Sequence, residues 1–321
     1  MKRVSIVGRT NLRPAQLEQL SGACDLSVYD TNVTSSQGEV EVIRRARSAE
    51  IAVVNAYTQV SSSVIGELPK LRTVISCSSG IDHVDLRACA AAGVNVRWFP
   101  GYCSRTLAEK AVAYVLLGLT RILPAIDNVR AGCWDYLAFQ AREIPGRIVA
   151  VVGYGATGKI VHDLCRGLGF QVVAITSDTP IAELQEAFRK ADAVTLHMDL
   201  NSSSQCFLNT STLAWLKPDT IIVNNARGGL IDHEALYAWL AGHPAATAFL
   251  DTLGVEPMAQ DDPGRRLPNV VVTPRIGWNS VESDEYLARE TYNAVVTAIA
   301  RGWTTDAGEI GSRLLLDQSE L

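Results

Sequence analysis

The sequence predicts an α/β protein of two domains, each built on a doubly wound parallel sheet of Rossmann-like or flavodoxin-like type. Its 321 residues exceed what one hydrophobic core usually organises, which indicates about two domains. Short β-branched runs alternate with stretches of helical spacing along the chain, and this alternation is typical of βαβ units. Hydrophobic residues make up 47% of the chain and charged residues 20%, as in ordinary globular proteins.

The first hundred residues predict one parallel sheet. Five short β-branched runs lie at 4–7, 25–29, 51–54, 73–76 and 94–97. Helical spacing separates them at 14–20, 39–47 and 84–92. A longer helical stretch at 104–121 then leads into a second βαβ series.

The second series predicts six further parallel strands. They lie at 148–152, 172–175, 193–197, 221–225, 247–251 and 270–273, and the last helix is expected at about 283–301. Six parallel strands make up a complete dinucleotide-binding sheet.

The sharpest local signal is the run IVAVVGYGATGKIV, in which a strand meets Gly153, Gly155 and Gly158 and then a helix. The first glycine permits a tight turn, the second lets the backbone approach a pyrophosphate, and the third allows close packing of helix on strand. The helix N-terminus attracts the phosphates. We expect the dinucleotide contacts at Gly153, Gly155, Ala156, Thr157 and Gly158.

An acidic residue about 20 positions later would accept hydrogen bonds from the adenosine ribose. The strand ends AITSD, with Thr176 where the acid is expected and Asp178 two residues later. Asp178 is either the ribose ligand or a helix-terminus residue, because Thr179 and Pro180 resemble the cap and first position of the next helix. No Arg or Lys stands nearby to receive a 2′-phosphate, so NAD is favoured and NADP remains an alternative.

Several partner classes are disfavoured by composition. The net charge is −5 and the basic residues are scattered, so a nucleic-acid partner is not expected. The N-terminus lacks the pattern of a signal peptide and no apolar run approaches about 20 residues, so we expect a cytoplasmic protein without a membrane span. The seven cysteines are dispersed and without a CxxC pair, which argues against disulfides and a metal site.

Further motifs resemble the D-isomer-specific 2-hydroxyacid dehydrogenase family. They are ADAVTLHMDL, NNARGGLIDHEAL, FLDTLGVEP and NVVVTPRIGWNS, with PGYCSRTLAEKAVAYVLLGLTR and SSGIDHVDL upstream, over roughly residues 70–300. The resemblance implies a discontinuous substrate-binding domain at 1–98 plus 285–321 and an NAD(P)-binding Rossmann domain at 99–284. It also implies an active site in the cleft between the domains and a homodimer formed through the cofactor domain.

The resemblance implies roles for four substrate-site residues. Arg227 in NNARGG matches the arginine that binds the substrate carboxylate and polarises its carbonyl, for which a planar guanidinium offers two parallel donors. Glu256 in GVEP matches the acid that orients the catalytic histidine. Ser79 and Gly80 match the loop whose backbone amides hold the substrate carboxylate.

Four more residues are expected at the cofactor. Asp251 in FLD matches the residue that engages the nicotinamide, and Ala226 lies beside Arg227 on the same cofactor-lining loop. His197 follows a strand at the expected cofactor edge, although a structural histidine is almost as good an interpretation. Thr106 is either a nicotinamide or phosphate contact or a helix cap.

The sequence departs from the family at one catalytic position. The family's proton donor is a histidine in a TPHI segment, and this chain has TPRI with Arg275 there. Histidine titrates near the working pH, whereas arginine stays protonated and is a poor proton shuttle. Arg275 can still stabilise an oxyanion, and with Arg227 it would suit a doubly charged substrate. Substitute acids near the expected cleft are Lys110, Tyr102, Cys103 and His83.

Three functions follow from these observations. The first is an NAD(H)-dependent oxidoreductase that acts on a small anionic 2-hydroxy or 2-oxo acid, a dianion among them, with altered proton transfer. The second is a non-redox or lyase-like enzyme with structural or transiently used NAD, since a fold does not fix a reaction. The third is a catalytically silent protein that senses NAD.

Overall fold

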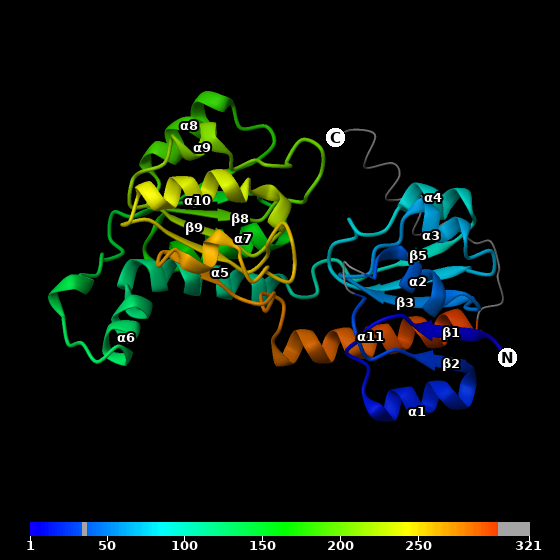
Figure 1. Ribbon diagram of the computed structural model, residues 1–321. Helices are drawn as coiled ribbons and strands as arrows, with labels where there is room; N and C mark the ends of the chain where they lie inside the picture. Colours follow the sequence, from blue (N-terminus) through cyan, green and yellow to red (C-terminus); the bar gives the residue numbers. More distant parts are fainter. Residues whose placement is uncertain (34–36, 301–321) are drawn as a thin grey trace. The chain divides into compact units, whose positions relative to one another are not determined.

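The computed structural model describes residues 1–33 and 37–300, and the chain forms two compact α/β units (Figure 1). Unit 1 contains Met1–Tyr102 and the described residues from Val281 on, and unit 2 contains Cys103–Ser280. The chain therefore passes between the units twice, after Tyr102 and after Ser280. The predicted fold of two parallel-sheet α/β domains is confirmed.

Unit 1 is built on a five-stranded parallel sheet in the order β2-β1-β3-β4-β5, which is the flavodoxin-like order. Its strands are β1 (Arg3–Ile6), β2 (Asp25–Val28), β3 (Ile51–Asn55), β4 (Thr73–Cys77) and β5 (Asn95–Arg97). Its helices are α1 (Pro14–Ala23), α2 (Gly38–Ala46), α3 (Ser62–Gly66), α4 (Leu86–Ala91) and α11 (Val281–Ala300).

Both faces of this sheet are covered by helices. Successive side chains of a strand point to opposite faces. Ile51 and Val53 of β3 accordingly pack with residues of α1 and α11, whereas Ala52 and Val54 pack with residues of α2, α3 and α4. This two-sided burial explains why the strands read as continuous apolar runs rather than as alternating patterns.

Unit 2 is built on a six-stranded parallel sheet in the order β11-β10-β9-β8-β6-β7. Its strands are β6 (Ile148–Val152), β7 (Gln171–Ile175), β8 (Ala193–Leu196), β9 (Ile221–Asn224), β10 (Thr247–Leu250) and β11 (Val270–Val272). Its helices are α5 (Ser104–Thr120), α6 (Ile122–Arg130), α7 (Ala156–Leu168), α8 (Ile181–Lys190), α9 (Thr210–Leu213) and α10 (His233–Gly242). Three 3-10 turns are η1 (Leu137–Phe139), η2 (Gly228–Leu230) and η3 (Pro263–Arg266).

The unit 2 sheet is also buried on both faces. Val149 and Val151 of β6 pack with α5 and α7, whereas Ala150 and Val152 pack with α8, α9 and α10. The chain reverses its direction across the sheet between β6 and β8. In open α/β sheets a ligand binds outside the carboxyl ends of the strands at such a reversal.

The helical stretch predicted at 104–121 is observed as α5, which ends at Thr120 with Arg121 as its C-cap. Arg121 adopts a left-handed backbone with φ 52°, and a separate helix α6, which was not predicted, begins at Ile122. Helix α8 begins at Ile181 with Pro180 as its N-cap, one residue later than predicted. Thr179 does not cap this helix, because its Oγ1 accepts the N–H of Thr176 in the preceding turn.

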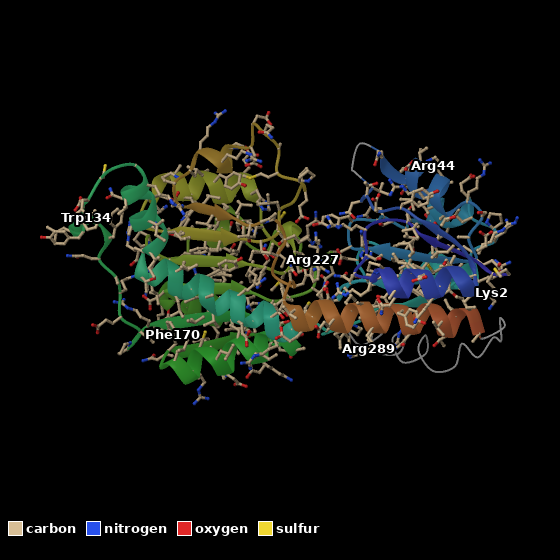
Figure 2. All side chains as sticks on the ribbon, turned by 90° about the horizontal axis from the view of Figure 1, so that it is seen from below. Lys2, Arg44, Trp134, Phe170, Arg227 and Arg289 are labelled. Carbon is tan, nitrogen blue, oxygen red and sulfur yellow. The ribbon has the colours of Figure 1, made fainter. Side chains whose placement is uncertain are left out.

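Helix α6 carries no buried residue and presents an apolar side to solvent. Ile122, Ile126 and Val129 are 46%, 40% and 52% exposed and follow one another at the i, i+4, i+7 spacing of a single helix face. Figure 2 shows Trp134 at the outer end of the segment that follows, and it is 83% exposed. Among the described residues no single helix is long and apolar enough to cross a membrane, and only the bent pair α5 and α6 meets those limits when taken together.

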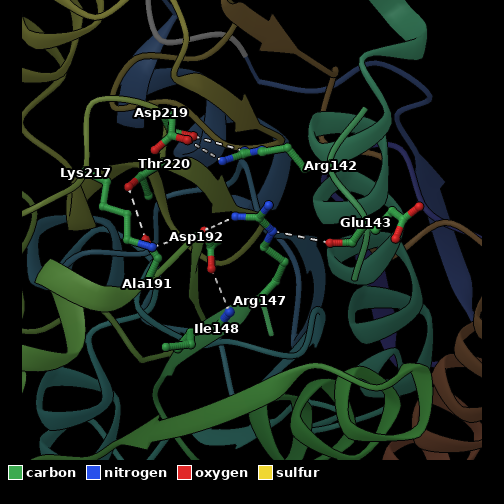
Figure 3. Close-up of polar contacts among 9 residues, drawn as sticks. All are labelled: Arg142, Glu143, Arg147, Ile148, Ala191, Asp192, Lys217, Asp219 and Thr220. Atoms are coloured by element: carbon green, nitrogen blue, oxygen red, sulfur yellow. Dashed lines mark hydrogen bonds and ion pairs between the residues drawn. The ribbon is translucent and has the colours of Figure 1, made fainter. Parts of the chain in front are cut away.

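An ionic network around Asp192 links the segment just before β6 to the strand ends of the unit 2 sheet (Figure 3). The buried Asp192 carboxylate accepts the N–H of Ile148 at 2.8 Å and pairs with Lys217 at 3.1 Å and Arg147 at 3.3 Å. Burial by itself would raise the pKa of Asp192, but the Ile148 hydrogen bond and the two cations outweigh burial and lower it. The network therefore holds the amino ends of β6 and β8 together.

Candidate active site

The glycine-rich turn lies between β6 and α7 at the reversal of the sheet. Gly153 has φ 93°, a backbone that favours glycine, and its N–H donates to Ile175 O. A Cβ at Gly158 would lie 1.9 Å from Gly153 O, so only glycine lets the helix approach the turn this closely. A Cβ at Gly155 would meet nothing within 4 Å. Gly155 is the N-cap of α7, and Ala156 and Thr157 open its first turn.

His197 lies directly against this turn. A Cβ at Gly153 would be 2.6 Å from the His197 carbonyl carbon, and the His197 N–H donates to Val152 O. The His197 Nε2 is buried without a hydrogen-bond partner. Burial lowers the pKa of His197 to about 4, so the ring is neutral at physiological pH.

The end of β7 forms a polar turn in which Asp178 is exposed. The Asp178 N–H donates to Thr176 Oγ1 at 3.3 Å, and the Thr176 N–H donates to Thr179 Oγ1 at 2.9 Å. Thr176 is therefore engaged within the turn, and Asp178 is the acidic residue of this turn.

Arg227 follows β9 as the N-cap of η2 and is labelled in Figure 2. Asn224 shapes this loop, since its Nδ2 donates to Arg227 O and its Oδ1 accepts the N–H of Ala226. Gly228 comes next, and a Cβ there would lie 2.0 Å from the Leu253 carbonyl. The sequence analysis missed this close approach of Gly228 to the Leu253 backbone, although the GG pair in NNARGG is a signal of it.

Asp251 is a buried carboxylate at the end of β10, 3% exposed. Its Oδ1 accepts the hydroxyl of Thr273 at 2.6 Å and the N–H of Ile276 at 2.8 Å, and its Oδ2 accepts the N–H of Gly277 at 2.6 Å. Burial raises the pKa of Asp251, and these hydrogen bonds oppose the increase. Asp251 thus holds the loop that carries Arg275.

Glu256 and Arg275 form an ion pair. Glu256 Oε2 accepts from Arg275 Nη1 at 2.6 Å, and the two side chains are 17% and 21% exposed. The other carboxylate oxygen accepts the N–H of Leu253 at 3.0 Å. Position 275 therefore holds a cation whose charge Glu256 balances.

Thr106 and Lys110 lie on α5 and face the loop after β11. Thr106 is not a helix cap, because the N-cap of α5 is Cys103, and its Oγ1 lies 2.9 Å from Ser280 Oγ. Lys110 Nζ donates to Ile276 O, and to Asn279 O at 2.9 Å. Burial lowers the pKa of Lys110, and the nearby Asp251 carboxylate opposes that change.

Ser79 and Gly80 lie in unit 1, in the loop after β4. Ser79 Oγ accepts the N–H of Gly101 at 3.0 Å, and Gly80 O accepts the hydroxyl of Ser78 at 2.7 Å. His83, considered as a substitute acid, is 5% exposed with its Nε2 2.8 Å from Ser76 Oγ. Of the other substitutes, Cys103 is buried and Tyr102 stacks on Tyr286.

The residues of unit 2 fit a dinucleotide. Gly155 leaves open space at the N-terminus of α7, where first-turn amides have no intrahelical acceptor. The unpartnered Nε2 of His197 adds a buried polar group beside the same turn. Within the described ranges no three His, Cys, Asp or Glu side chains gather where they could share a metal ion.

Comparison with known proteins agrees with this geometry. The model of the NAD binding domain of D-isomer specific 2-hydroxyacid dehydrogenases matches residues 112–277. The chain is 28% identical to glycerate dehydrogenase of Methylorubrum extorquens over 93% of its own length and 96% of the relative. It is 31% identical to D-3-phosphoglycerate dehydrogenase of Mycobacterium tuberculosis over 84% of its own length, and it spans about half of that protein, 53%.

A solved structure is similar over almost the whole chain. It is an acyclic imino acid reductase in complex with NADPH and D-Arg, with a TM-score of 0.80 and 25% identity. The alignment covers 93% of this chain and 97% of that one.

Proposed function

Because the chain belongs to the D-isomer specific 2-hydroxyacid dehydrogenase family and carries its NAD binding domain, we propose that it acts on a small anionic 2-hydroxy or 2-oxo acid with altered proton transfer. The observation that carries the proposal is the Glu256–Arg275 pair at 2.6 Å. It retains the family's glutamate at the catalytic position but replaces the titratable partner with a permanent cation.

We assign the cofactor to the carboxyl edge of the unit 2 sheet. The amides of Gly155, Ala156 and Thr157 bind the pyrophosphate at the N-terminus of α7. Asp178 binds the adenosine ribose, and the remaining contacts come from Gly153, Gly158, Thr106, His197, Ala226 and Asp251. Asp251 uses three of about four acceptor positions on groups of the loop after β11, so one remains for the nicotinamide amide.

The cofactor preference follows from the turn after β7. An acidic Asp178 favours the free ribose hydroxyls of NAD, since a 2′-phosphate beside a carboxylate is repelled. Thr176, where the acid is usually found, carries no charge, so NADPH is disfavoured only weakly. We propose NAD as the main cofactor and NADP as a second one.

Three elements are proposed to bind the substrate. Arg227 of unit 2 binds the substrate carboxylate through its two parallel donors. The backbone amides of Ser79 and Gly80 in unit 1 are proposed as a further anion-binding element. Arg275 supplies a second positive charge, which suits a dianion and stabilises oxygen-centred negative charge. When bound, NADH would supply the hydride. Arginine does not titrate in this pH range, so the proton that the reduced carbonyl oxygen needs would come from solvent water and not from Arg275.

A second candidate substrate is a 2-imino acid. The Glu256–Arg275 pair holds no proton that it can release, and a protonated imine already carries its proton on nitrogen. Addition of one hydride to the carbon of this protonated C=N bond yields the neutral amine without any acid from the protein. The similar structure of an acyclic imino acid reductase supports this candidate.

We further propose that the chain forms a homodimer through unit 2. The apolar side of α6 and Trp134, Tyr136 and Leu137 place six exposed large apolar side chains within residues 122–137. A surface of this kind marks a protein–protein contact rather than a monomer surface. A cytoplasmic location is part of the proposal, since all seven cysteines are free thiols.

One experiment tests these functions together. NADH and NADPH oxidation is followed with glyoxylate, pyruvate, hydroxypyruvate and a dicarboxylic or phosphorylated 2-oxo acid, each with and without methylamine. Turnover of the doubly charged 2-oxo acid in the absence of methylamine supports the first candidate. Turnover that requires methylamine supports the second. Thermal stabilisation by NADH without turnover of any substrate would favour a silent NAD-sensing protein. Absence of stabilisation by either nucleotide would contradict the proposal.

A further inference from the structure

The loop between β11 and α11 is fastened to helix α5. Lys110 Nζ donates to the carbonyl oxygens of Ile276 and Asn279, which lie 166 and 169 positions away in the sequence. One helical turn earlier, Thr106 Oγ1 lies 2.9 Å from Ser280 Oγ. The chain leaves unit 1 after Tyr102, just before α5, and leaves unit 2 after Ser280. The Thr106–Ser280 contact therefore links, inside unit 2, the two segments that lead to these crossings.

The opposite side of the same loop is held by the end of the sheet. Asp251, which follows β10, accepts the amides of Ile276 and Gly277. Helix α5 adds a further contact, since Tyr114 Oη lies 3.0 Å from Thr273 Oγ1. A Cβ at Gly277 would lie 2.6 Å from Asp251 Oδ2 and 2.9 Å from a methyl carbon of Leu107, so the loop packs tightly between the carboxylate and α5.

Arg275 sits immediately before these anchors in an unfavourable backbone conformation. Its φ is 54°, in the left-handed region that residues with a Cβ seldom adopt. Such a conformation persists only where the surroundings determine it. The Arg275 N–H donates to Thr273 O at 2.9 Å. The next residue, Ile276, donates its N–H to Asp251 and accepts a hydrogen bond from Lys110 at its C=O.

We propose that Lys110 is a positioning residue that fixes the backbone after Arg275 and thereby aims the Arg275 guanidinium at Glu256 and at the substrate anion. The ammonium group suits this task because it offers three donors and no acceptor, so it can bridge two carbonyl oxygens of one turn. Lys110 is then not a substitute acid, since its donors are committed to the backbone. The catalytic part of this inference rests on the proposed function, whereas the loop anchoring does not.

The loop anchoring is tested without any substrate, by hydrogen–deuterium exchange of the full chain. Lys110→Met removes the donors and keeps the length of the side chain, and Lys110→Arg keeps donors and charge. We expect the amides of 276–279 to exchange about tenfold faster or more in Lys110→Met and near the wild-type rate in Lys110→Arg. Lys190→Met is the matched control, because Lys190 is exposed on α8 and pairs only with Glu186 among the contacts described. Unchanged exchange in Lys110→Met would overturn the proposal.

The catalytic part is tested with a double-mutant cycle. Lys110→Met should lower kcat/KM for the anionic substrate about 10- to 100-fold, as a misplaced binding group does, while NADH affinity stays within about twofold. In an Arg275→Ala background the same change should have almost no further effect, because Lys110 acts through Arg275. Additive losses would mean that Lys110 acts independently and would refute the positioning role. A wild type without turnover on any substrate would contradict the proposed function. Hydrogen–deuterium exchange of the amides of 276–279 would still decide whether Lys110 anchors the loop.

Discussion

The Arg275 guanidinium donates to the Glu256 carboxylate across 2.6 Å, at the position where the family's histidine is expected. The other Glu256 oxygen is held by the Leu253 amide, so the carboxylate is oriented independently of its partner. A histidine at position 275 would therefore meet a carboxylate that is already in place.

Arg275→His should raise the reduction of ordinary 2-oxo acids by at least about tenfold, because general acid catalysis typically contributes about 10²- to 10⁴-fold. The rate should fall at high pH as the imidazole loses its proton. NADH oxidation from pH 5 to 9 with glyoxylate, pyruvate and hydroxypyruvate measures this gain. In Arg275→His with Glu256→Gln the gain should be smaller, since the imidazolium loses its carboxylate. A wild type that already reduces these acids at about ten per second or more would show that another residue supplies the proton.

Arg227→Lys should weaken substrate capture and leave NADH affinity almost unchanged. Lysine keeps the charge but loses the two parallel donors of the guanidinium, so KM should rise by about tenfold or more. Steady-state kinetics measures KM, and fluorescence titration with NADH measures cofactor affinity. If both affinities fell equally, Arg227 would be a structural residue of the loop after β9.

Gly158→Ala should destabilise unit 2 and weaken NADH binding, because the new methyl group would lie 1.9 Å from the Gly153 carbonyl oxygen. Overpacking of this kind costs about 1–3 kcal/mol. Gly167→Ala is the matched control on the same helix, where a Cβ meets nothing within 4 Å, and it should stabilise the protein by up to about 1 kcal/mol. Thermal unfolding with and without NADH measures both effects. Equal stability of the two variants would contradict the close approach.

Asp192→Asn should destabilise the protein by roughly 3 kcal/mol at pH 7, because Lys217 and Arg147 lose their buried partner. The lowered pKa of Asp192 means that its contribution is present above the unfolded-state value of about 3.9 and is lost as the pH falls. The difference between wild type and variant should therefore shrink in acid. Urea unfolding from pH 7 down to about pH 2 measures it. Asp163→Asn, whose side chain is 78% exposed, serves as the control. A difference that grew in acid would refute this account.

Ile126→Glu with Val129→Glu should convert the proposed homodimer into a monomer, since both side chains lie on the exposed apolar side of α6. Sedimentation velocity measures the mass in solution. Ile181→Glu is the control, because Ile181 is 67% exposed on α8 and outside the α6 segment. A wild type that is already monomeric at micromolar concentration would exclude the dimer.

Local patterns in the sequence determined the strands and the positions of the chemical groups. All eleven strands of the described chain lie at the β-branched runs. The signal is strongest in central strands such as β3 and β8, because burial on both sheet faces demands mostly apolar residues there. The glycine spacing of the turn after β6 is equally local. A Cβ at Gly158 would meet Gly153 O within the motif, a Cβ at Gly153 would meet the His197 backbone on the adjacent strand end, and Gly155 leaves open space. The presence of Arg at position 275 was likewise readable directly from TPRI.

Only the tertiary structure decided which groups these residues meet. The helical stretch was expected to end at 121, as α5 does within one residue, but the separate helix α6 that follows the left-handed Arg121 was not predicted. Lys110 reads as one more residue of a helical pattern, yet its ammonium binds carbonyls more than 160 positions away. Asp251 reads as a strand-end acid, and the fold directs its oxygens to the loop of Arg275. Periodicity reports which face of an element is buried, whereas contacts between distant segments depend on how the loops are packed, and no local pattern encodes that.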